Sequence, residues 1–280
     1  MKKLLSLLVS LALLGVIYWQ LSRRGQLDDL LRVFRECDAL WMALALGMVV
    51  PLTLFTAWRL QQLMPRHDQL SFGEANRLIL SASVLNLILP SKMGDIAKAW
   101  FMKERGHLRG SLALSLVVFE KTCDMLSLLL WCAFGLLLYP AKDALFWSMT
   151  AAVSGAFVFG SLLLGSRTVA AFFFRLTRLS RLSSAWTEMH TYFWSSKARL
   201  ATVAVTSVFI WFLHLVQIWM FILALRVYAP FLASLALSPL AILAGLLPLT
   251  FAGVGTRDAA LVLLYRPYFD APAAAALGLL

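Results

Sequence analysis

Long apolar runs separated by short charged segments dominate this chain. Five runs approach the length of about 20 residues that an α-helix needs to cross the hydrocarbon core of a bilayer. The first run follows a charged start, as in a signal peptide, but no small-residue cleavage pattern follows it, so we expect a retained helix. The pattern predicts an all-α polytopic membrane protein with spans at residues 4–21, 39–63, 111–138, 144–165 and 201–225.

Two further apolar runs are broken. Residues 78–90 offer only about 13 apolar positions, which suits a re-entrant segment within 74–90 that enters and leaves on one side. Residues 232–249 are apolar, and the chain then breaks before it resumes. We therefore expect about 6–7 transmembrane helices, including two re-entrant or broken ones. The tail 271–280 is too short to cross, so either a last span is missing or the end packs as a stub.

A basic, aromatic-rich segment occupies residues 166–200. Its interleaved phenylalanine, leucine, tryptophan and arginine side chains predict helices that lie in the cytoplasmic membrane interface. A plain cytoplasmic linker is the alternative. Lys2 and Lys3, residues 91–110 and this segment all carry excess positive charge, so the positive-inside rule predicts a cytoplasmic N-terminus. Arg59, near the end of the second apolar run, is expected to extend to the membrane surface.

Composition agrees with a single membrane domain over residues 1–280. The chain is 61% hydrophobic and 14% charged, whereas about 25% of residues are charged in soluble proteins. Its net charge of +11 fits cytoplasmic loops and anionic lipid headgroups, so we expect no nucleic-acid partner. Three cysteines and four scattered histidines lack metal-ligand spacing, so we expect no metal and no cofactor.

Three charged residues inside the third span, Glu120, Lys121 and Asp124, are the most informative feature. Glu120 lies about 13 Å from Ser111 along a helix, and a charge at such depth costs about 2.5–3 kcal/mol. Glu120 and Asp124 share a helix face, while Lys121 and Asp124 are spaced to pair. We expect a buried translocation or relay site. The alternative is an ion-paired cluster that only holds the bundle together.

Two short motifs suggest an internal repeat. In each, proline ends an incoming helix, glycine permits a sharp turn, and an aspartate starts the next helix. The preceding spans run in opposite directions, which predicts inverted repeat units at about 39–138 and 201–280 around a midplane substrate site. Two unrelated helix corners are the alternative. The motifs are Pro90, Gly94, Asp95 and Lys98, and Pro248, Gly253, Gly255, Arg257 and Asp258.

The order and spacing of these motifs resembles the flippase-like membrane domain of the lysylphosphatidylglycerol synthase family, over residues 40–265. That domain has a Pro-Gly-Arg-x-Gly-Glu type turn, a Glu-Arg-x-x-Asp type intramembrane motif and a late Gly-x-Gly-x-Arg-Glu turn. This chain departs from it, because lysine cannot form the bidentate fork of arginine, so headgroup preference can differ. Asp95 and Asp258 stand where glutamate is usual, and Lys92, Lys98 and Lys121 where arginine is usual.

The resemblance implies a lipid flippase or scramblase in a prokaryotic plasma membrane, acting on anionic phospholipids or polyprenyl-phosphate lipids. Lys92, Lys98 and Arg257 would contact phosphate, and Asn86 would form a hydrogen bond at depth. Glu120 and Asp124 would balance these cations, or bind a basic headgroup or a proton. Asp95 and Asp258 would join this site or only cap helices. A homo-oligomer is compatible with the sequence.

Two other functions stay open. The chain could be an accessory subunit of envelope lipid or glycolipid synthesis, docked through residues 166–200. It could also be an integral-membrane lipid-modifying enzyme, since two carboxylates on one face can perform acid–base chemistry. The sequence has no nucleophile–histidine arrangement, metal motif or phosphate-binding loop, so we expect no enzyme. Nothing in these 280 residues corresponds to the soluble lysyl-transferring domain of the full synthases, so we expect no lipid aminoacylation.

Overall fold

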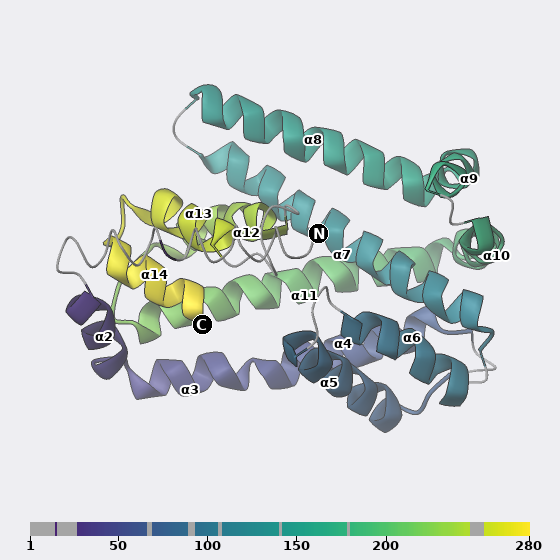
Figure 1. Ribbon diagram of the computed structural model, residues 1–280, viewed down its shortest axis with the longest axis horizontal. Coiled ribbons are helices and arrows are strands. Elements are labelled where there is room, and N and C mark those ends of the chain that lie inside the picture. The colour runs from purple at the N-terminus through teal and green to yellow at the C-terminus, as the bar shows by residue number, and fades with distance from the viewer. Residues whose placement is uncertain are drawn as a thin grey trace. The chain divides into compact units, whose positions relative to one another are not determined.

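The computed structural model describes residues 15, 27–65, 69–88, 93–105, 108–139, 142–177, 180–246 and 255–280, and these ranges contain helices and no strand (Figure 1). The predicted all-α class is confirmed. The helices are α2 (Leu27–Arg35), α3 (Ala39–Gly47), α4 (Val49–Leu63), α5 (Phe72–Ile88), α6 (Met93–Arg105), α7 (Gly110–Leu138), α8 (Ala144–Gly165), α9 (Arg167–Leu176), α10 (Ser180–Trp194), α11 (Lys197–Ala224), α12 (Phe231–Leu246), α13 (Thr256–Tyr265) and α14 (Ala271–Leu279).

Four helical stretches are long and apolar enough to cross a membrane: Ala39–Leu63, Gly110–Leu138, Phe146–Gly165 and Lys197–Ala224. They match four of the five predicted spans and confirm a multi-pass membrane protein. The first predicted span, 4–21, lies outside the described residues apart from Gly15. The apolar helix α12 has only 16 residues, which is short for a full crossing.

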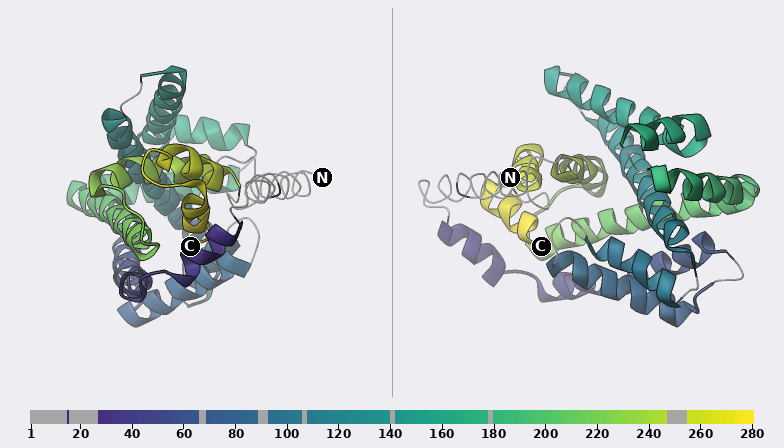
Figure 2. Two further views of the ribbon diagram at one scale, coloured as in Figure 1. Left: turned by 90° about the vertical axis from the view of Figure 1, so that its left-hand side faces the viewer. Right: turned by 45° about the vertical axis from the view of Figure 1, so that its right-hand side comes forward.

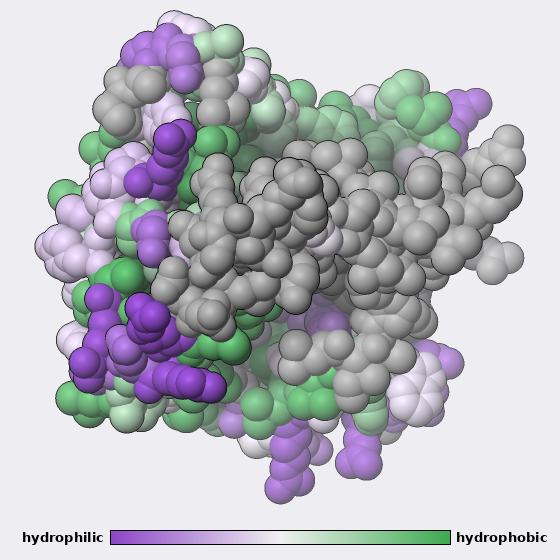
Figure 3. Space-filling view, turned by 60° about the vertical axis from the view of Figure 1, so that its left-hand side comes forward, coloured by the Kyte–Doolittle hydropathy of each residue, from purple (hydrophilic) through white to green (hydrophobic). Residues whose placement is uncertain are grey.

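Large apolar side chains on these spans face away from the protein. Leu137 on α7, Trp147 on α8 and Val205 on α11 are among the most exposed. One face in Figure 3 shows green apolar residues that reach the surface between separate purple hydrophilic groups. Such extensive apolar exposure is uncommon in a soluble monomer and is typical of a surface that meets lipid.

The chain forms two compact units that share α7, α8 and α11. One unit contains residues 50–130 and 151–211, and its apolar core joins α4–α7 with α9–α11. The ring of Phe119 stacks on Phe193 of α10 with a centroid distance of 4.4 Å. The hydroxyl of Tyr192 donates to the carbonyl of Met64 at 3.2 Å. These contacts fix the C-terminal end of α4 and the N-terminal half of α7 against α10.

Within this unit, α5 and α6 form a tight antiparallel hairpin (Figures 1 and 2). Ser71 caps α5, because its Oγ accepts the N–H of Glu74 and its own N–H donates to the Glu74 carboxylate, a capping box. A Cβ on Gly94 would collide with the carbonyl oxygen of Ala82, so this close approach requires glycine. Helix α5 covers most of the segment 74–90 that we predicted to be re-entrant. Its location in the membrane stays a prediction.

The segment predicted as interfacial helices contains α9 and α10, so its helical character is confirmed and its position at the interface stays a prediction. His190 and Trp194 on α10 cap the C-terminus of α8. Arg167 Nε donates to His190 Nδ1 at 3.1 Å, and His190 Nε2 lies 3.2 Å from the Gly165 carbonyl. Trp194 donates to the Leu164 carbonyl at 3.3 Å. Burial lowers the pKa of His190, so the neutral ring is favoured.

The other unit contains residues 1–49, 131–150 and 212–280. Helix α12 is buried along residues 234–241, and its Ser238 hydroxyl lies 2.7 Å from the Tyr265 hydroxyl of α13. The C-terminal tail forms the short helix α14, which packs against α13 and α2. The two units interleave along the chain. Their limits therefore differ from those predicted for the repeat units, and the repeat stays a prediction.

Candidate functional site

The centre of the candidate site is Arg59 on α4, which lies between two carboxylates of α7. Its Nη2 donates to Glu120 Oε1 at 2.9 Å, and its two terminal nitrogens donate to both carboxylate oxygens of Asp124. Nη1 also donates to the Ser207 hydroxyl of α11 at 2.9 Å. A planar guanidinium can bond several acceptors at once in this way. One side chain thereby connects α4, α7 and α11.

Lys98 on α6 completes the buried part of the network. Its Nζ donates to Glu120 Oε2, while Arg59 donates to Oε1. Each carboxylate oxygen of Glu120 therefore accepts a hydrogen bond from a different cation. Arg59 and Lys98 are 2% exposed and Glu120 is 1% exposed. Glu120 and Asp124 are four residues apart on α7, and they share one helix face, as their spacing predicted. Both carboxylates on this face contact Arg59.

The network continues to a more accessible pair. Lys121 Nζ lies 3.4 Å from Asp95 of α6 and 3.6 Å from Asp124, which is the pairing that the sequence predicted for Lys121 and Asp124. Lys121 is 46% exposed. Three cations therefore face three carboxylates, and exposure increases from Glu120 towards Lys121. We call Arg59, Asp95, Lys98, Glu120, Lys121 and Asp124 the charge network.

The second predicted motif belongs to the other unit. Gly255 has a φ of 95°, a left-handed conformation that favours glycine. Its N–H donates to Asp258 Oδ2 at 2.9 Å, so Asp258 caps α13. Arg257 donates to the Gly278 carbonyl of α14, and its Nε lies 3.5 Å from Asp258. Asp258 thus acts as the helix cap that was one of its two predicted roles, while Asp95 forms an ion pair.

Comparison with known families identifies the chain. The family model described as the lysylphosphatidylglycerol synthase TM region matches residues 3–280. The chain belongs to the lysylphosphatidylglycerol synthase transmembrane family. Searches of curated proteins and of solved structures give no match. The resemblance found in the motifs is therefore confirmed, and this family member is a membrane protein with a lipid-related role.

Arg59 is the residue of this family member that the sequence analysis placed wrongly. We expected its side chain to extend to the membrane surface, but it is buried among carboxylates. The guanidinium of Arg59 is stabilised by its ion pairs with Glu120 and Asp124. These carboxylates in turn need a nearby cation, because an unpaired charge inside the protein is costly. The signal was present in the sequence as an arginine within an apolar span, which needs a partner when it faces inward.

Lys98 is bound through its ammonium to Glu120, one of the two carboxylates that we expected to balance the cations of the site. Its contact with phosphate stays a prediction. Asn86 lies near the C-terminal end of α5, where its Oδ1 is buried and finds no hydrogen-bond donor among the described residues. It would lie 2.7 Å from a Cβ on Gly94. Lys92, Pro90, Pro248 and Gly253 lie outside the described residues.

The site has no features of a metal centre within the described part of the chain. Histidine, cysteine, aspartate and glutamate side chains form no group of three or more there that could hold a metal ion. Cys37, Cys123 and Cys132 are free. The chemistry that the charge network can perform is the exchange of ion-pair partners and the binding of ions or polar headgroups.

Proposed function

We propose that this protein moves a phosphate-bearing lipid between the two leaflets of a membrane. The observation that carries the proposal is the charge network in the middle of the longest span. Asp124 is 14 residues from Gly110 and 14 from Leu138, the two ends of α7. At about 1.5 Å per residue it therefore lies near the centre of a helix about 43 Å long.

A purely structural role explains such a network poorly. Replacing a buried ion pair by well-packed apolar residues is often neutral or stabilising by about 1–4 kcal/mol. Charges inside membrane spans are expensive and commonly mark transport paths. The graded exposure towards Lys121 is the arrangement that a polar headgroup would need to reach buried charges from the surface.

The proposed mechanism is an exchange of partners. A lipid phosphate first takes the place of Asp95 or Asp124 beside Lys121. Glu120 then retains Arg59 and Lys98 as counter-ions, or takes up a proton while the phosphate passes. Arg59 Nε is buried and has no acceptor among the described residues, so it offers one further donor.

The lipid class and the membrane belong to the same proposal. Membership in a lipid-synthase transmembrane family supports a lipid substrate. The cations Arg59, Lys98 and Lys121 could bind phosphate oxygens when they exchange their carboxylate partners, which suits anionic phospholipids or polyprenyl-phosphate lipids. The basic segments between spans favour a cytoplasmic N-terminus in a prokaryotic plasma membrane.

Leaflet exchange of headgroup-labelled lipids in proteoliposomes tests the proposal. The informative variant is Lys98→Gln/Glu120→Gln, which removes one cation and one carboxylate and so keeps the network neutral. Its matched control is Lys103→Gln/Glu104→Gln, an exposed ion pair at 3.6 Å on the same helix as Lys98. Both variants are compared at equal reconstitution and equal thermal stability.

We expect the parent and the control to exchange anionic lipid, and the Lys98→Gln/Glu120→Gln protein to lose exchange. Exchange that survives in this variant would show that translocation does not use Glu120 and Lys98. Absence of exchange by the parent refutes the proposal, provided that anionic, zwitterionic and polyprenyl-phosphate lipids are tested with and without a proton gradient.

One observation favours a second function. Each charge of the network has an oppositely charged partner in the structure, as expected of a cluster that holds helices in place. A rigid bundle of this kind suits an accessory subunit that positions a lipid-synthesis enzyme. An accessory protein should keep its partner's activity in the Lys98→Gln/Glu120→Gln variant, which separates the two functions.

A further inference from the structure

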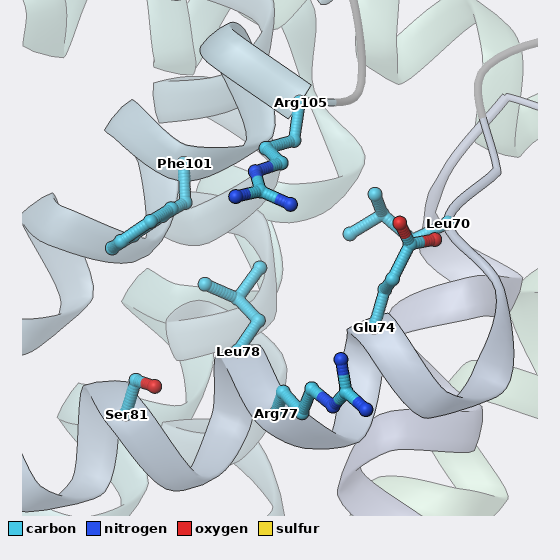
Figure 4. A pocket seen from close by; sticks show the side chains of 7 residues that line it. All are labelled: Leu70, Glu74, Arg77, Leu78, Ser81, Phe101 and Arg105. Atoms are coloured by element: carbon cyan, nitrogen blue, oxygen red, sulfur yellow. The ribbon is translucent and has the colours of Figure 1, made fainter.

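A cavity of about 260 Å³ lies between α5 and α6, at the open end of the hairpin. It shares no residue with the charge network. Figure 4 shows side chains from both helices around it, with the guanidinium of Arg105 pointing into the space above Leu78. We call it the hairpin pocket. Its lining is Leu70, Glu74, Arg77, Leu78, Ser81, Phe101 and Arg105.

Two arginines from different helices converge on the hairpin pocket. Arg77 is on α5 and Arg105 is on α6, and both side chains are exposed. Neither forms an ion pair with a carboxylate of the described residues, although Glu104 beside Arg105 pairs with Lys103. Two guanidiniums held on separate helices can bond an anion from two sides.

Glu74 offsets only one of the two positive charges of these arginines. Its carboxylate accepts the Ser71 N–H at 3.0 Å and the Ser71 hydroxyl at 2.7 Å, so it is held at the start of α5. These hydrogen bonds, with smaller contributions from Arg105 and Arg77, lower the pKa of Glu74, so it is ionised at neutral pH. The two arginines and this glutamate leave one net positive charge at the hairpin pocket.

We infer that the hairpin pocket binds a phosphodiester, the singly charged group that joins the headgroup and glycerol of a phospholipid. One net positive charge matches a phosphodiester better than a doubly charged phosphomonoester. Arg77 and Arg105 would bond the phosphate oxygens, as guanidiniums commonly do. Leu78 and Phe101 form an apolar wall suited to the glycerol and the first acyl carbons.

The size of the hairpin pocket agrees with this ligand. Its volume of about 260 Å³ is below the range of about 300–1,000 Å³ for sites of drug-sized molecules. It is large enough for a phosphodiester headgroup, and the acyl chains of a lipid would lie outside it. The inference concerns binding alone and does not depend on whether the protein moves lipid between leaflets.

The test measures binding of radiolabelled phosphatidylglycerol to the purified full-length chain in neutral-detergent micelles. Three competitors identify the recognised chemistry. Glycerophosphoglycerol presents the soluble phosphodiester, glycerol 3-phosphate presents a monoester, and diacylglycerol presents the chains without phosphate. Competition by glycerophosphoglycerol shows that the phosphodiester suffices, and competition only by unlabelled phosphatidylglycerol shows that the ligand must be a lipid.

The variant Arg77→Gln/Arg105→Gln removes both guanidiniums. We expect it to weaken binding about tenfold or more, since charged hydrogen bonds are involved. The matched control Lys103→Gln/Arg175→Gln removes the same charge from exposed residues outside the hairpin pocket and should bind like the parent. Ser81→Phe narrows the hairpin pocket without changing its charge and should also weaken binding.

Several results would overturn the inference. These are parent-like binding by the Arg77→Gln/Arg105→Gln protein, equal weakening by the control, or parent-like binding by Ser81→Phe. Stronger competition by glycerol 3-phosphate than by glycerophosphoglycerol would refute the charge match. Competition by diacylglycerol equal to that of phosphatidylglycerol would show that phosphate is not recognised. Unchanged melting temperatures of the variants establish that the comparison is between folded proteins.

Discussion

Replacing Glu120 by glutamine should destabilise the protein more than replacing Glu120 and Lys98 together. Glu120 is the shared acceptor of Arg59 and Lys98, all three nearly inaccessible. In the Glu120→Gln protein the buried cations Arg59 and Lys98 would have only the carboxylate of Asp124 as a nearby counter-charge. Breaking a buried pair by removing one partner costs about 3–5 kcal/mol, a large part of the roughly 5–15 kcal/mol that stabilises a typical domain.

The double substitution Lys98→Gln/Glu120→Gln restores charge balance, because Arg59 keeps its two bonds to Asp124. We expect a loss of about 2 kcal/mol or less, since one neutral hydrogen bond can replace the ion pair. Lys98→Gln alone should cost about as much as Glu120→Gln, because it leaves an excess buried carboxylate. The loss of the double variant should therefore be smaller than the sum of the two single losses. The difference should be several times the roughly 0.5 kcal/mol within which independent sites add.

Reversible unfolding in mixed micelles, followed by circular dichroism against the mole fraction of denaturing detergent, measures these losses. The exposed pair Lys103→Gln/Glu104→Gln is the control and should change stability by less than about 1 kcal/mol. Losses that add within about 0.5 kcal/mol would refute the reasoning, because they would mean that Lys98 and Glu120 do not share a buried environment.

Three further predictions concern other contacts. Gly94→Ala should cost about 1–3 kcal/mol in unfolding experiments, because the backbone of Ala82 blocks the new methyl, whereas Gly73→Ala, which meets nothing, should not destabilise. Arg59→Lys keeps the positive charge but loses the planar guanidinium that donates to several acceptors at once. The free energy of unfolding should decrease by about 1.5–3 kcal/mol. Burial lowers the pKa of His190 in the folded protein. As the pH falls, the unfolded chain therefore binds a proton at this residue before the folded protein does. The contribution of His190 to the free energy of unfolding should be complete above about pH 6.5 and should decrease below it. Melting curves at pH 7.5 and 5.5 test this, and His190→Phe should reduce the difference.

The spans could be predicted because hydropathy over about 20 residues is a local property. The predicted limits 111–138 and 144–165 agree closely with α7 and α8. Helix α5 is longer than its apolar stretch suggested, since the capping box of Ser71 and Glu74 starts it before the apolar residues. The pairing of Lys121 with Asp124 follows from their spacing on one helix.

The partners of the charge network could not be predicted in the same way. Arg59 is 61 residues from Glu120 and 65 from Asp124, and only the rotation of α4 decides whether its side chain faces lipid or protein. The contact of Lys98 with Glu120 could not be predicted for the same reason. The hairpin pocket could not be predicted from the sequence, because Arg77 and Arg105 are 28 positions apart and neither belongs to a motif. They line one cavity only because α5 and α6 pack against each other.

The position of Arg59 has a consequence for biosynthesis. During synthesis Arg59 is made 61 residues before Glu120, which at about 5–20 residues per second is a delay of roughly 3–12 s. Until then Arg59 has neither of its two carboxylate partners, and an unpaired arginine within a span costs up to about 2.5–3.5 kcal/mol. Helix α4 is therefore expected to stay beside the insertion machinery until α7 emerges, so that the two helices enter the bilayer as a neutral pair.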